Sequence, residues 1–419
     1  MKPLNVAVLG IGNVGTGLIE TYRLNKVKVD GQTNQPFNFK YILVNSIDKL
    51  RTIDLKDSIL TTDFQDIIKD DSIDVVIELI GGLHPAFDYM KRALEAGKHV
   101  ITANKAAIAT YGPELRQIAS DNKVLLRYEA SVCGGIPLLN TLSENLLSND
   151  FEELVGILNG TTNYILTRMT EEGLEFDEAL KLAQEAGFAE ADPSSDIEGD
   201  DAAYKLCILS HIAFGLNVDP KDIPKHGITK VSKEDIEYAQ ELGYKIKLLA
   251  AAHKKENTVD LRVNPALIKD THPLASVNHE FNALFLKGNA LGELMLYGKG
   301  AGAMPTGSSV LSDLIAISKK TPSMIEQKTT IALENRSLLK YYIRLEVIDE
   351  PGVLGKVATL LGEHGISLDS VVQRARGNKV APLVFLTHEI DKKTLDGAIK
   401  SVEAYDKIVE IASLMSVEN

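Results

Sequence analysis

A glycine-rich turn lies directly after the first apolar segment of the chain. Residues 4–9 are apolar and are expected to form a buried strand, and residues 16–24 have the pattern of a helix. The turn between them reads Gly10-Ile11-Gly12-Asn13-Val14-Gly15. A strand, the spacing Gly-x-Gly-x-x-Gly and a helix, in this order, are typical of a doubly wound α/β domain that binds a dinucleotide. The order therefore predicts a Rossmann-type parallel sheet with helices on both faces.

Each glycine of this turn is expected to have its own task. Gly10 allows the tight turn, Gly12 lets the backbone approach a pyrophosphate, and Gly15 lets the helix pack closely on the strand. The pyrophosphate is expected at the N-terminus of the helix, where backbone N–H groups attract anions. Asn13 and Val14 are therefore also predicted cofactor contacts.

Four further apolar runs, separated by helical stretches, continue the doubly wound pattern: residues 40–45, 74–80, 99–102 and 124–128. Such alternation is expected of a parallel sheet. Ligands of these sheets bind at the carboxyl ends of the strands. The residues after two of the strands are therefore predicted to lie beside the nicotinamide, namely Gly81, Thr102 and Lys105.

The end of the second strand bears on the choice of coenzyme. NAD enzymes usually have an acidic residue there, about 20 residues past the glycine turn. Here a polar insertion, residues 30–36, delays the strand, which ends at Asn45-Ser46 without an acid. Lys49 and Arg51 follow and can neutralise a 2′-phosphate. We therefore predict a preference for NADP, with NAD tolerated.

A second motif groups carboxylates and a lysine around a loop between two helices. Residues 176–187 have helical spacing with Gly187 at the C-cap, and a new helix is expected to start near Gly199. The charged residues of this region include Glu190, Asp196, Asp201 and Lys205. Asp201 and Lys205 are four residues apart and share a helix face. Taken alone, this pair also fits a capped helix with an exposed ion pair.

The whole run from Ala183 to Lys205 resembles the signature of homoserine dehydrogenases, and every specified position of that signature is met. The resemblance covers essentially the whole chain and is to the monofunctional form. It implies reversible NAD(P)H-dependent reduction of L-aspartate 4-semialdehyde to L-homoserine, a step of threonine and methionine biosynthesis. It also implies roles for the charged residues: Lys205 donates a proton with Lys105 as its partner, while Glu190, Asp196 and Asp201 bind the substrate ammonium and orient Lys205 or a water.

Two further segments contain glycines. In the first, residues 129–137, the resemblance implies a site for a monovalent cation, Na⁺ or K⁺, made by Glu129, Val132, Gly134 and Ile136. A glycine-rich hinge is an equally good interpretation of this segment. The second segment, residues 298–306, lacks regular periodicity. It is expected to be a loop that returns to the cofactor, with Gly302 at the nicotinamide.

The C-terminal part of the chain has a β-α-β-β-α-β pattern beginning at Tyr341. Its turn Asp349-Glu350-Pro351-Gly352-Val353-Leu354 resembles that of the ACT domain, which has a ferredoxin-like fold. Two interpretations stand open: a site for an amino-acid effector such as threonine, or a dimerisation module without an effector. The predicted domains are a cofactor domain at 1–130, an α+β substrate and dimerisation domain with a mostly open sheet at 131–320, a linker at 321–338 and an ACT domain at 339–419.

Composition limits the remaining classes of function. The 419 residues carry a net charge of −13, which argues against a general affinity for nucleic acid or anionic membranes. Residues 1–3 lead straight into the first strand, so we expect no signal peptide, and no apolar run reaches the ~20 residues of a membrane span. We expect a cytoplasmic homodimer or homotetramer. Two alternatives are a non-catalytic sensor of nucleotide and amino acid, and a semialdehyde dehydrogenase with Cys133 as its nucleophile.

Overall fold

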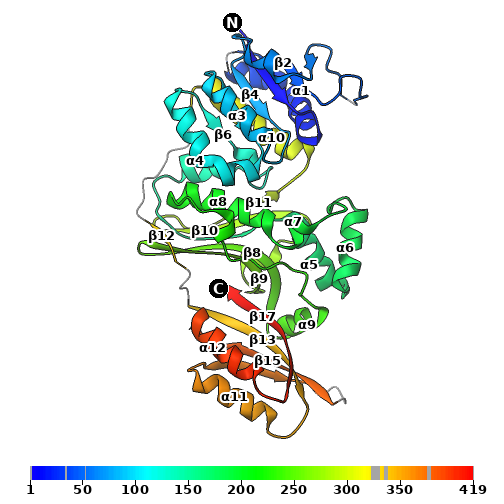
Figure 1. The fold of residues 1–419 in the computed structure, drawn as a ribbon, viewed down its shortest axis with the longest axis vertical. Coiled ribbons are helices and arrows are strands. Elements are labelled where there is room, and N and C mark those ends of the chain that lie inside the picture. The colour runs from blue at the N-terminus through cyan, green and yellow to red at the C-terminus, as the bar shows by residue number, and fades with distance from the viewer. Residues whose placement is uncertain are drawn as a thin grey trace. The chain divides into compact units, whose positions relative to one another are not determined.

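The structure is a computed structural model that describes residues 2–33, 35–51, 53–321, 331–334, 338–374 and 379–418. Most of the predicted linker, residues 322–330 and 335–337, lies outside the described residues. The chain forms two compact units (Figure 1). Unit 1 comprises Met1–Glu152, Ala203–Ile223 and Asn282–Ile331, and unit 2 comprises Glu153–Ala202, Pro224–Phe281 and Ala332–Asn419.

Unit 1 contains a six-stranded parallel sheet with the order β3-β2-β1-β4-β5-β6. The strands are β1 (Leu4–Leu9), β2 (Phe37–Leu43), β3 (Ile59–Thr61), β4 (Val75–Glu78), β5 (His99–Thr102) and β6 (Leu126–Arg127). Apolar side chains of the central strands, such as Val8 and Ile77, are fully buried. The strand order reverses between β1 and β4, where sheets of this type bind their ligands. The predicted doubly wound sheet is thus confirmed.

The first helix is longer than predicted. Helix α1 runs over Asn13–Thr33, whereas the sequence pattern indicated residues 16–24 followed by a polar insertion from residue 30. Asp30 lies inside the helix, where its carboxylate is 2.6 Å from the ammonium of Lys26 one turn earlier. Val29 is also buried. Tertiary burial and an ion pair along the helix therefore extend it through residues whose polarity resembles that of a loop.

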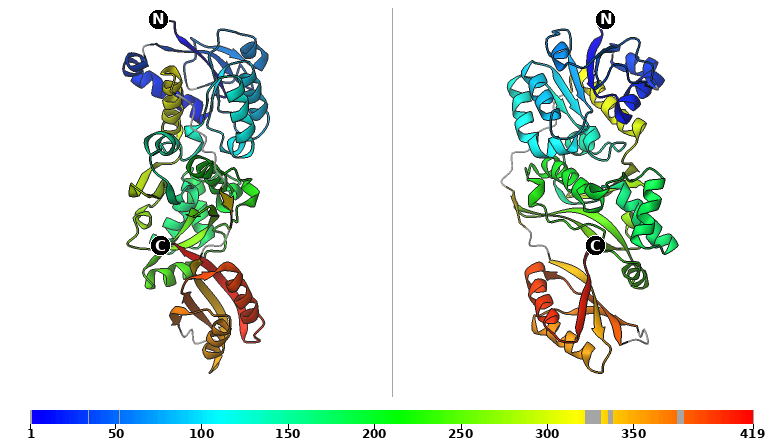
Figure 2. Two further views of the ribbon diagram at one scale, coloured as in Figure 1. Left: turned by 90° about the vertical axis from the view of Figure 1, so that its left-hand side faces the viewer. Right: turned by 45° about the vertical axis from the view of Figure 1, so that its right-hand side comes forward.

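The other helices of unit 1 are α2 (Phe64–Ile68), α3 (Ala86–Glu95), α4 (Lys105–Asp121) and α10 (Ala303–Ser318), together with most of α8 (Asp200–Phe214). Helix α10 packs on α1, although nearly 300 residues separate them (Figure 2). A methyl group at Gly17 would lie 2.0 Å from the carbonyl oxygen of Ala303, so only glycine permits this approach. The last part of unit 1 thereby returns to the helix that follows the glycine turn.

Residues 298–306 are more regular than predicted. Gly298 and Lys299 end strand β11 (Gly292–Lys299), which follows β10 (Phe281–Gly288), and residues 303–306 form the first turn of α10. Only residues 300–302 are irregular between them. The glycines in this segment suggested a flexible loop, but close packing requires them: a methyl group at Gly300 would meet the Asn282 side chain at 1.9 Å.

Unit 2 is built around strands in the order β7-β8-β9-β17-β13-β15-β14. Strands β8 (Tyr244–Lys255) and β9 (Thr258–Lys269) form a long antiparallel hairpin, and β7 (Phe151–Ile157) pairs with β8. Strand β8 was not predicted, because its four lysines interrupt the apolar pattern. Helices α5 (Gly160–Glu172) and α9 (Lys233–Glu241) pack on β8, and α6 (Phe176–Glu185) packs on α5.

The C-terminal part of unit 2 confirms the predicted β-α-β-β-α-β order. Its elements are β13 (Leu338–Ile348), α11 (Val353–Glu363), β14 (Leu368–Gln373), β15 (Val380–Thr387), α12 (Lys392–Glu403) and β17 (Ile408–Glu418). The two helices cover one face of the strands (Figure 2). Residues 416–418 at the end of β17 also pair in parallel with β9. The last strand therefore has two neighbours in the sheet: it pairs with β13 on one side and with β9 on the other. The two-residue strands β12 (Ala332–Leu333) and β16 (Ile390–Asp391) pair with β9 and β13.

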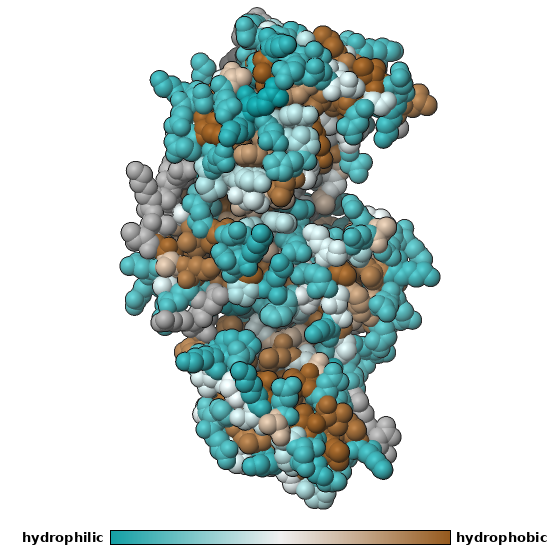
Figure 3. Space-filling model, viewed as in Figure 1, coloured by the Kyte–Doolittle hydropathy of each residue, from teal (hydrophilic) through white to brown (hydrophobic). Residues whose placement is uncertain are grey.

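Hydrophilic side chains cover most of the molecular face seen in Figure 3, with smaller hydrophobic groups among them. In the part of the chain that the structure describes, no helix has the length and apolarity needed to cross a membrane.

Candidate functional site

The glycine turn between β1 and α1 has the geometry of a cradle for a dinucleotide. Gly10 has a φ of +96°, and a methyl group there would lie 2.8 Å from the Leu79 carbonyl oxygen. A methyl group at Gly15 would lie 2.6 Å from the Gly10 carbonyl oxygen. At Gly12, in contrast, no protein atom lies within 4 Å of the added carbon. The turn is thus packed against the protein at Gly10 and Gly15 but faces open space at Gly12. Helix α1 begins directly after Gly12, with Asn13 and Val14. This arrangement fits the pyrophosphate of a nicotinamide cofactor.

A buried carboxylate organises the ends of β4 and β5. The side chain of Glu78 is fully buried and accepts hydrogen bonds from the backbone N–H groups of Ile80 and Gly81, at 2.7 and 3.0 Å. The Thr102 hydroxyl donates to its other oxygen at 2.6 Å. Two predicted cofactor residues, Gly81 and Thr102, are therefore brought together by an acid that the sequence analysis did not single out. The signal was available, because Glu78 is an acid inside the apolar run of residues 75–80.

Asn104 completes this edge of the sheet. Its backbone N–H donates to the Thr102 hydroxyl at 2.9 Å, and its side-chain amide donates to the Gly82 carbonyl at 2.6 Å. Its side-chain oxygen accepts from the N–H of Ala107 and so caps helix α4, whose first residue is Lys105. The cap determines where α4 starts and thereby places Lys105 at the carboxyl ends of the strands.

The loop after β2 contains the predicted coenzyme-selective cations. The guanidinium of Arg51 donates to the backbone carbonyls of Ser46, Ile47 and Lys49. These contacts hold the guanidinium close to the residues that follow the end of β2. Arg51 is therefore placed beside the strand end at which doubly wound folds recognise the adenosine ribose.

The signature region folds in unit 2 as α6, a short helix α7 (Ser194–Ile197) and the start of α8. Gly187 has a φ of +76° directly after α6, as predicted for its C-cap region, and Gly199 has a φ of +87° before α8. The loop between α6 and α7 is attached to α5, because the Thr161 hydroxyl donates to the Phe188 carbonyl at 2.6 Å and the rings of Tyr164 and Phe188 are in contact. Helix α7 was not predicted.

Asn159 brings two of the predicted substrate residues together. Its side-chain nitrogen donates to a carboxylate oxygen of Asp196 at 2.7 Å and to one of Asp201 at 2.8 Å. Its side-chain oxygen accepts from the backbone N–H of Thr162 and caps α5. Asn159 is 4% exposed and Asp201 is 2% exposed. An amide thus joins two carboxyl groups, of which that of Asp201 is buried and that of Asp196 is half-buried.

Asn159 was not among the residues predicted for the site. The only available signal was its position before the phrase Gly160-Thr161-Thr162-Asn163-Tyr164, where an Asn is a favoured N-cap. That signal predicts a helix cap but not the contact with Asp196 and Asp201. The contact joins residues 37 and 42 positions apart.

The remaining predicted residues differ in their exposure. Glu190 is exposed in the loop after α6, and its carbonyl accepts a hydrogen bond from the Gln184 side chain. Lys205 is 8% exposed on α8, one turn after Asp201. Lys105 is half-buried at the start of α4. A lysine ammonium with so little exposure as that of Lys205 is unusual unless it has partners or a function.

The segment that contains Glu129 is a tightly folded corner of unit 1. The Glu129 carboxylate is 1% exposed and accepts hydrogen bonds from the backbone N–H groups of Leu139 and Asn140, at 2.9 and 2.7 Å. Burial and the neighbouring Asp313 carboxyl raise the pKa of Glu129 to about 8. Gly134 is needed here, since a methyl group would lie 2.4 Å from the Thr306 hydroxyl. Val132 and Ile136 are buried in the same turn.

Within the described residues, no three or more His, Cys, Asp or Glu side chains are grouped so that they could hold a metal ion. The predicted cation site combines one carboxylate with backbone carbonyls and is a different kind of site. Cys133 is 1% exposed with a φ of +48° in the same turn. Burial of this kind is typical of an inert thiol rather than a nucleophile.

Comparison with known proteins agrees with this arrangement along the whole chain. Family models described as "Homoserine dehydrogenase, NAD binding domain", "Homoserine dehydrogenase" and "ACT domain" match residues 10–129, 137–315 and 341–406. The homoserine dehydrogenase of Bacillus subtilis is 39% identical over 428 residues, covering 100% of this chain and 99% of that protein.

Two solved structures are also similar. The homoserine dehydrogenase of Thiobacillus denitrificans has a TM-score of 0.96 at 38% identity, with 100% of this chain and 99% of that chain covered. A hyperthermophilic archaeal homoserine dehydrogenase mutant in complex with NADPH has a TM-score of 0.65 at 28% identity, with 77% and 99% covered.

Proposed function

This chain belongs to the homoserine dehydrogenase family, and from this membership we propose how its residues carry out the family's reaction. The enzyme is an NAD(P)-dependent oxidoreductase that acts on a CH–OH group. It interconverts L-aspartate 4-semialdehyde and L-homoserine. The full-length relatives support this function over a non-catalytic sensor or a semialdehyde dehydrogenase that uses Cys133.

Our assignment of the catalytic residues rests on one observation, the hydrogen-bonded cluster of Asn159, Asp196 and Asp201. Asp201 of this cluster lies one helical turn before Lys205 on α8. The cluster offers buried negative charge, which suits the ammonium group of an amino-acid substrate. Lys205 offers a proton on the same helix. A substrate that carries both an ammonium group and a carbonyl needs both features.

In the proposed mechanism, Asp196, Asp201 and the exposed Glu190 bind the substrate ammonium and orient Lys205 or a water. When bound, the nicotinamide supplies or accepts the hydride. Lys205 donates a proton to the C4 oxygen of the aldehyde as negative charge develops there, and it accepts that proton in the reverse direction. Lys105 is its partner near the reacting oxygen.

The proposed cofactor contacts comprise the glycine turn and the ends of β4 and β5: Gly10, Gly12, Asn13, Val14, Gly15, Gly81, Thr102 and Lys105. Gly302 is added at the start of α10. Its φ of +117° is accessible mainly to glycine and allows the backbone of residues 300–302 to bend into the helix. The open space around Gly12 supports the pyrophosphate position.

We propose NADPH as the preferred coenzyme, with NADH also used. Support comes from the place of Arg51 beside the end of β2, with Lys49 in the same loop. A 2′-phosphate at that position would receive charge-assisted hydrogen bonds that NADH cannot form. The solved structure of the archaeal homoserine dehydrogenase mutant, which is similar to this chain, is a complex with NADPH.

We propose a monovalent cation, Na⁺ or K⁺, at Glu129, Val132, Gly134 and Ile136. The buried carboxylate and the tight turn support this site. Activity measured in K⁺, Na⁺ and tetramethylammonium salts at equal ionic strength tests it. Equal rates in the three salts would favour the hinge interpretation of this segment.

The predicted domain boundaries at residues 130, 320 and 338 remain our proposal, as do a homodimer or homotetramer and an amino-acid effector such as threonine for the ACT domain. The ACT family model supports the last of these. Sedimentation velocity with and without threonine tests the assembly and the effector together.

The first experiment follows nicotinamide absorbance with purified protein, aspartate semialdehyde, and NADPH or NADH in parallel. We expect oxidation without added phosphate and a higher kcat/KM with NADPH. Arg51→Ala should lower the NADPH to NADH ratio of kcat/KM about tenfold or more, because one charge-assisted contact is worth about 1.5–3 kcal/mol. Arg92, a half-buried arginine in α3 of the same unit, gives the control variant Arg92→Ala. An unchanged ratio would remove Arg51 from coenzyme selection.

A further inference from the structure

A cavity of about 460 Å³ lies within unit 2, away from the residues to which we have given catalytic or cofactor roles. Its walls come from residues 224–231, from β9, from the start of β13 and from residues 411–416 of β17. Cavities that bind metabolite-sized ligands usually measure 300–1,000 Å³. The cavity is therefore large enough for a small organic molecule.

The cavity has a basic rim and an apolar floor. His226, Lys230 and Lys392 are exposed residues of its lining. Partial burial and the nearby Lys392 and Lys230 lower the pKa of His226, so at neutral pH the positive charge of the rim comes from the two lysines. Apolar residues of the floor include Val231 and Met415, which are 4% and 6% exposed.

Asp260, the acidic residue among those that line the cavity, is already paired: the Arg262 guanidinium donates to it at 3.0 Å. The same guanidinium donates to Glu418, which does not line the cavity, at 2.7 Å. Lys392 also has an ion pair with Asp396, but both side chains are about half exposed, so solvent weakens that attraction. The rim therefore presents an excess of positive charge. An organic anion whose carboxylate meets the rim and whose aliphatic body fills the floor has the matching chemistry.

One wall of the cavity is in contact with the signature region. The N–H of Ile228 donates to the Ile197 carbonyl at 2.8 Å, and the Lys225 ammonium is 2.7 Å from the Asp200 carboxylate. A methyl group at Gly227 would lie 2.2 Å from the Ile197 carbonyl oxygen, so the two segments are tightly packed. Ile197 follows Asp196, which Asn159 links to Asp201. A displacement of residues 225–228 therefore reaches the proposed substrate carboxylates through direct contacts.

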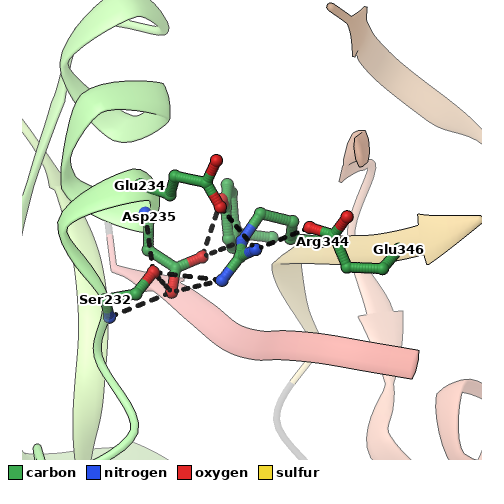
Figure 4. Close-up of polar contacts among 6 residues, drawn as sticks. Ser232, Glu234, Asp235, Arg344 and Glu346 are labelled. Carbon is green, nitrogen blue, oxygen red and sulfur yellow. Dashed lines mark hydrogen bonds and ion pairs between the residues drawn. The ribbon is translucent and has the colours of Figure 1, made fainter. Parts of the chain in front are cut away.

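The other end of the same segment is fixed to the ACT domain. Ser232 and helix α9 follow residues 224–231, and Arg344 of β13 binds them (Figure 4). Its guanidinium donates to Asp235 at 2.7 Å and to Glu234 at 3.0 Å. Asp235 is fully buried, so separating this pair would leave an unpaired buried charge. The cavity thus lies between a charge cluster that fixes the ACT strands and a backbone contact that fixes the signature region.

We propose that this cavity is a regulatory site for a small organic anion with an aliphatic body, separate from the ACT turn at residues 349–354. Binding of the anion shifts residues 224–231 and thereby changes the affinity for the amino-acid substrate. The coupling, but not the binding itself, rests on the proposed substrate role of Asp196 and Asp201. The ligand differs in class from the substrate, because the rim lacks a free carboxylate for an ammonium group among the lining acids described above.

The test uses 4-methylpentanoate as the probe and 4-methylpentanamide as its neutral analogue, with the full-length protein. Isothermal titration calorimetry should show at least fivefold tighter binding of the carboxylate than of the amide. The double variant Lys230→Gln, Lys392→Gln should bind the carboxylate at least tenfold more weakly. Lys356→Gln, an exposed lysine of α11, serves as the matched control and should bind it normally. Equal binding of acid and amide, or unchanged binding by the double variant, would overturn the site.

Coupling is measured separately, by hydrogen exchange of residues 194–201 and by KM for homoserine. Saturating carboxylate should change both in the wild type and in Lys356→Gln, and neither in the double variant. Binding without a change in exchange would overturn the regulatory role. A change in exchange without a change in KM would instead contradict the proposed substrate role of Asp196 and Asp201, so the two failures can be told apart.

Discussion

The glycine turn of unit 1 and the signature region of unit 2 are the two regions to which we assign cofactor binding and substrate binding, and they are built in opposite ways. In the turn, the proposed function depends on what the residues lack: Gly10 and Gly15 leave no room for a side chain, and Gly12 faces open space. In the signature region, the proposed function depends on side chains, since Asn159 holds Asp196 and Asp201 by direct hydrogen bonds. The site made by backbone atoms, the glycine turn, is specified by residues next to one another in the sequence. The site made by side chains, in the signature region, is specified by residues far apart in the sequence.

This difference has a consequence for mutation. A substitution in the glycine turn should weaken cofactor binding where the new side chain faces open space, and should destabilise the fold where it meets protein atoms. A change in the side-chain site should act on the chemical step or on the affinity for the amino acid. The following substitutions test that separation.

Lys205→Ala should have the largest effect. Removing a general acid usually lowers the rate by about 10²–10⁴-fold, and we expect kcat to fall by about 10³-fold. The Kd for NADPH, measured by fluorescence titration, should change less than threefold. Lys181→Ala, at a lysine whose side chain is 76% exposed, is the control. Substantial remaining turnover would remove Lys205 from proton transfer.

Asn159→Asp should have the next largest effect. The aspartate keeps an acceptor for the Thr162 N–H, but it replaces the donor to Asp196 and Asp201 with a third carboxylate. Loss of two hydrogen bonds to charged groups and the new repulsion should lower the free energy of unfolding by about 2–3 kcal/mol and raise KM for homoserine. Urea unfolding and steady-state kinetics measure these changes. Asn145→Asp, at an exposed asparagine, should be neutral, and equal effects of both variants would contradict the role of Asn159.

The two glycines Gly12 and Gly10 should respond differently to alanine. Gly12→Ala places a methyl group in open space, so thermal stability should be retained while the Kd for NADPH rises about tenfold or more. Gly10→Ala combines a φ of +96° with a contact at 2.8 Å, so the free energy of unfolding should fall by at least about 1–2 kcal/mol. Scanning calorimetry and coenzyme titration separate the effects. If Gly12→Ala lost stability and kept coenzyme affinity, the cradle would be misassigned.

Glu190→Ala should have the smallest effect, because this carboxylate is exposed and solvent screens its charge. We expect KM for homoserine to rise by up to about tenfold with kcat changed less than threefold. Glu185→Ala, at an exposed glutamate that ends α6, is the control. An unchanged KM would contradict a binding role for Glu190.

The two regions also differ in how far sequence reasoning reached. The strand before Gly10, the glycine spacing and the parallel strands of unit 1 follow from local patterns, and the structure confirms them. Helix α1 continues to Thr33 and α10 begins at Ala303 because each buries a face against the other, which no local pattern reveals. Strand β8 was missed because its lysines conceal the alternation of a strand, although Lys247 is 3% exposed and donates to the Val277 carbonyl.

The sequence by itself determined the family, the doubly wound cofactor sheet, the ACT pattern and the types of chemical group at the site. Each of these depends on residues close together in the chain, whose spacing directly limits the backbone. Only the tertiary structure decided that Asn159 joins Asp196 to Asp201, that Glu78 organises Gly81 and Thr102, and that β17 extends from the ACT strands to β9. These contacts join residues that are far apart in the sequence. They form because folding buries polar groups, and each buried polar group needs a hydrogen-bond partner.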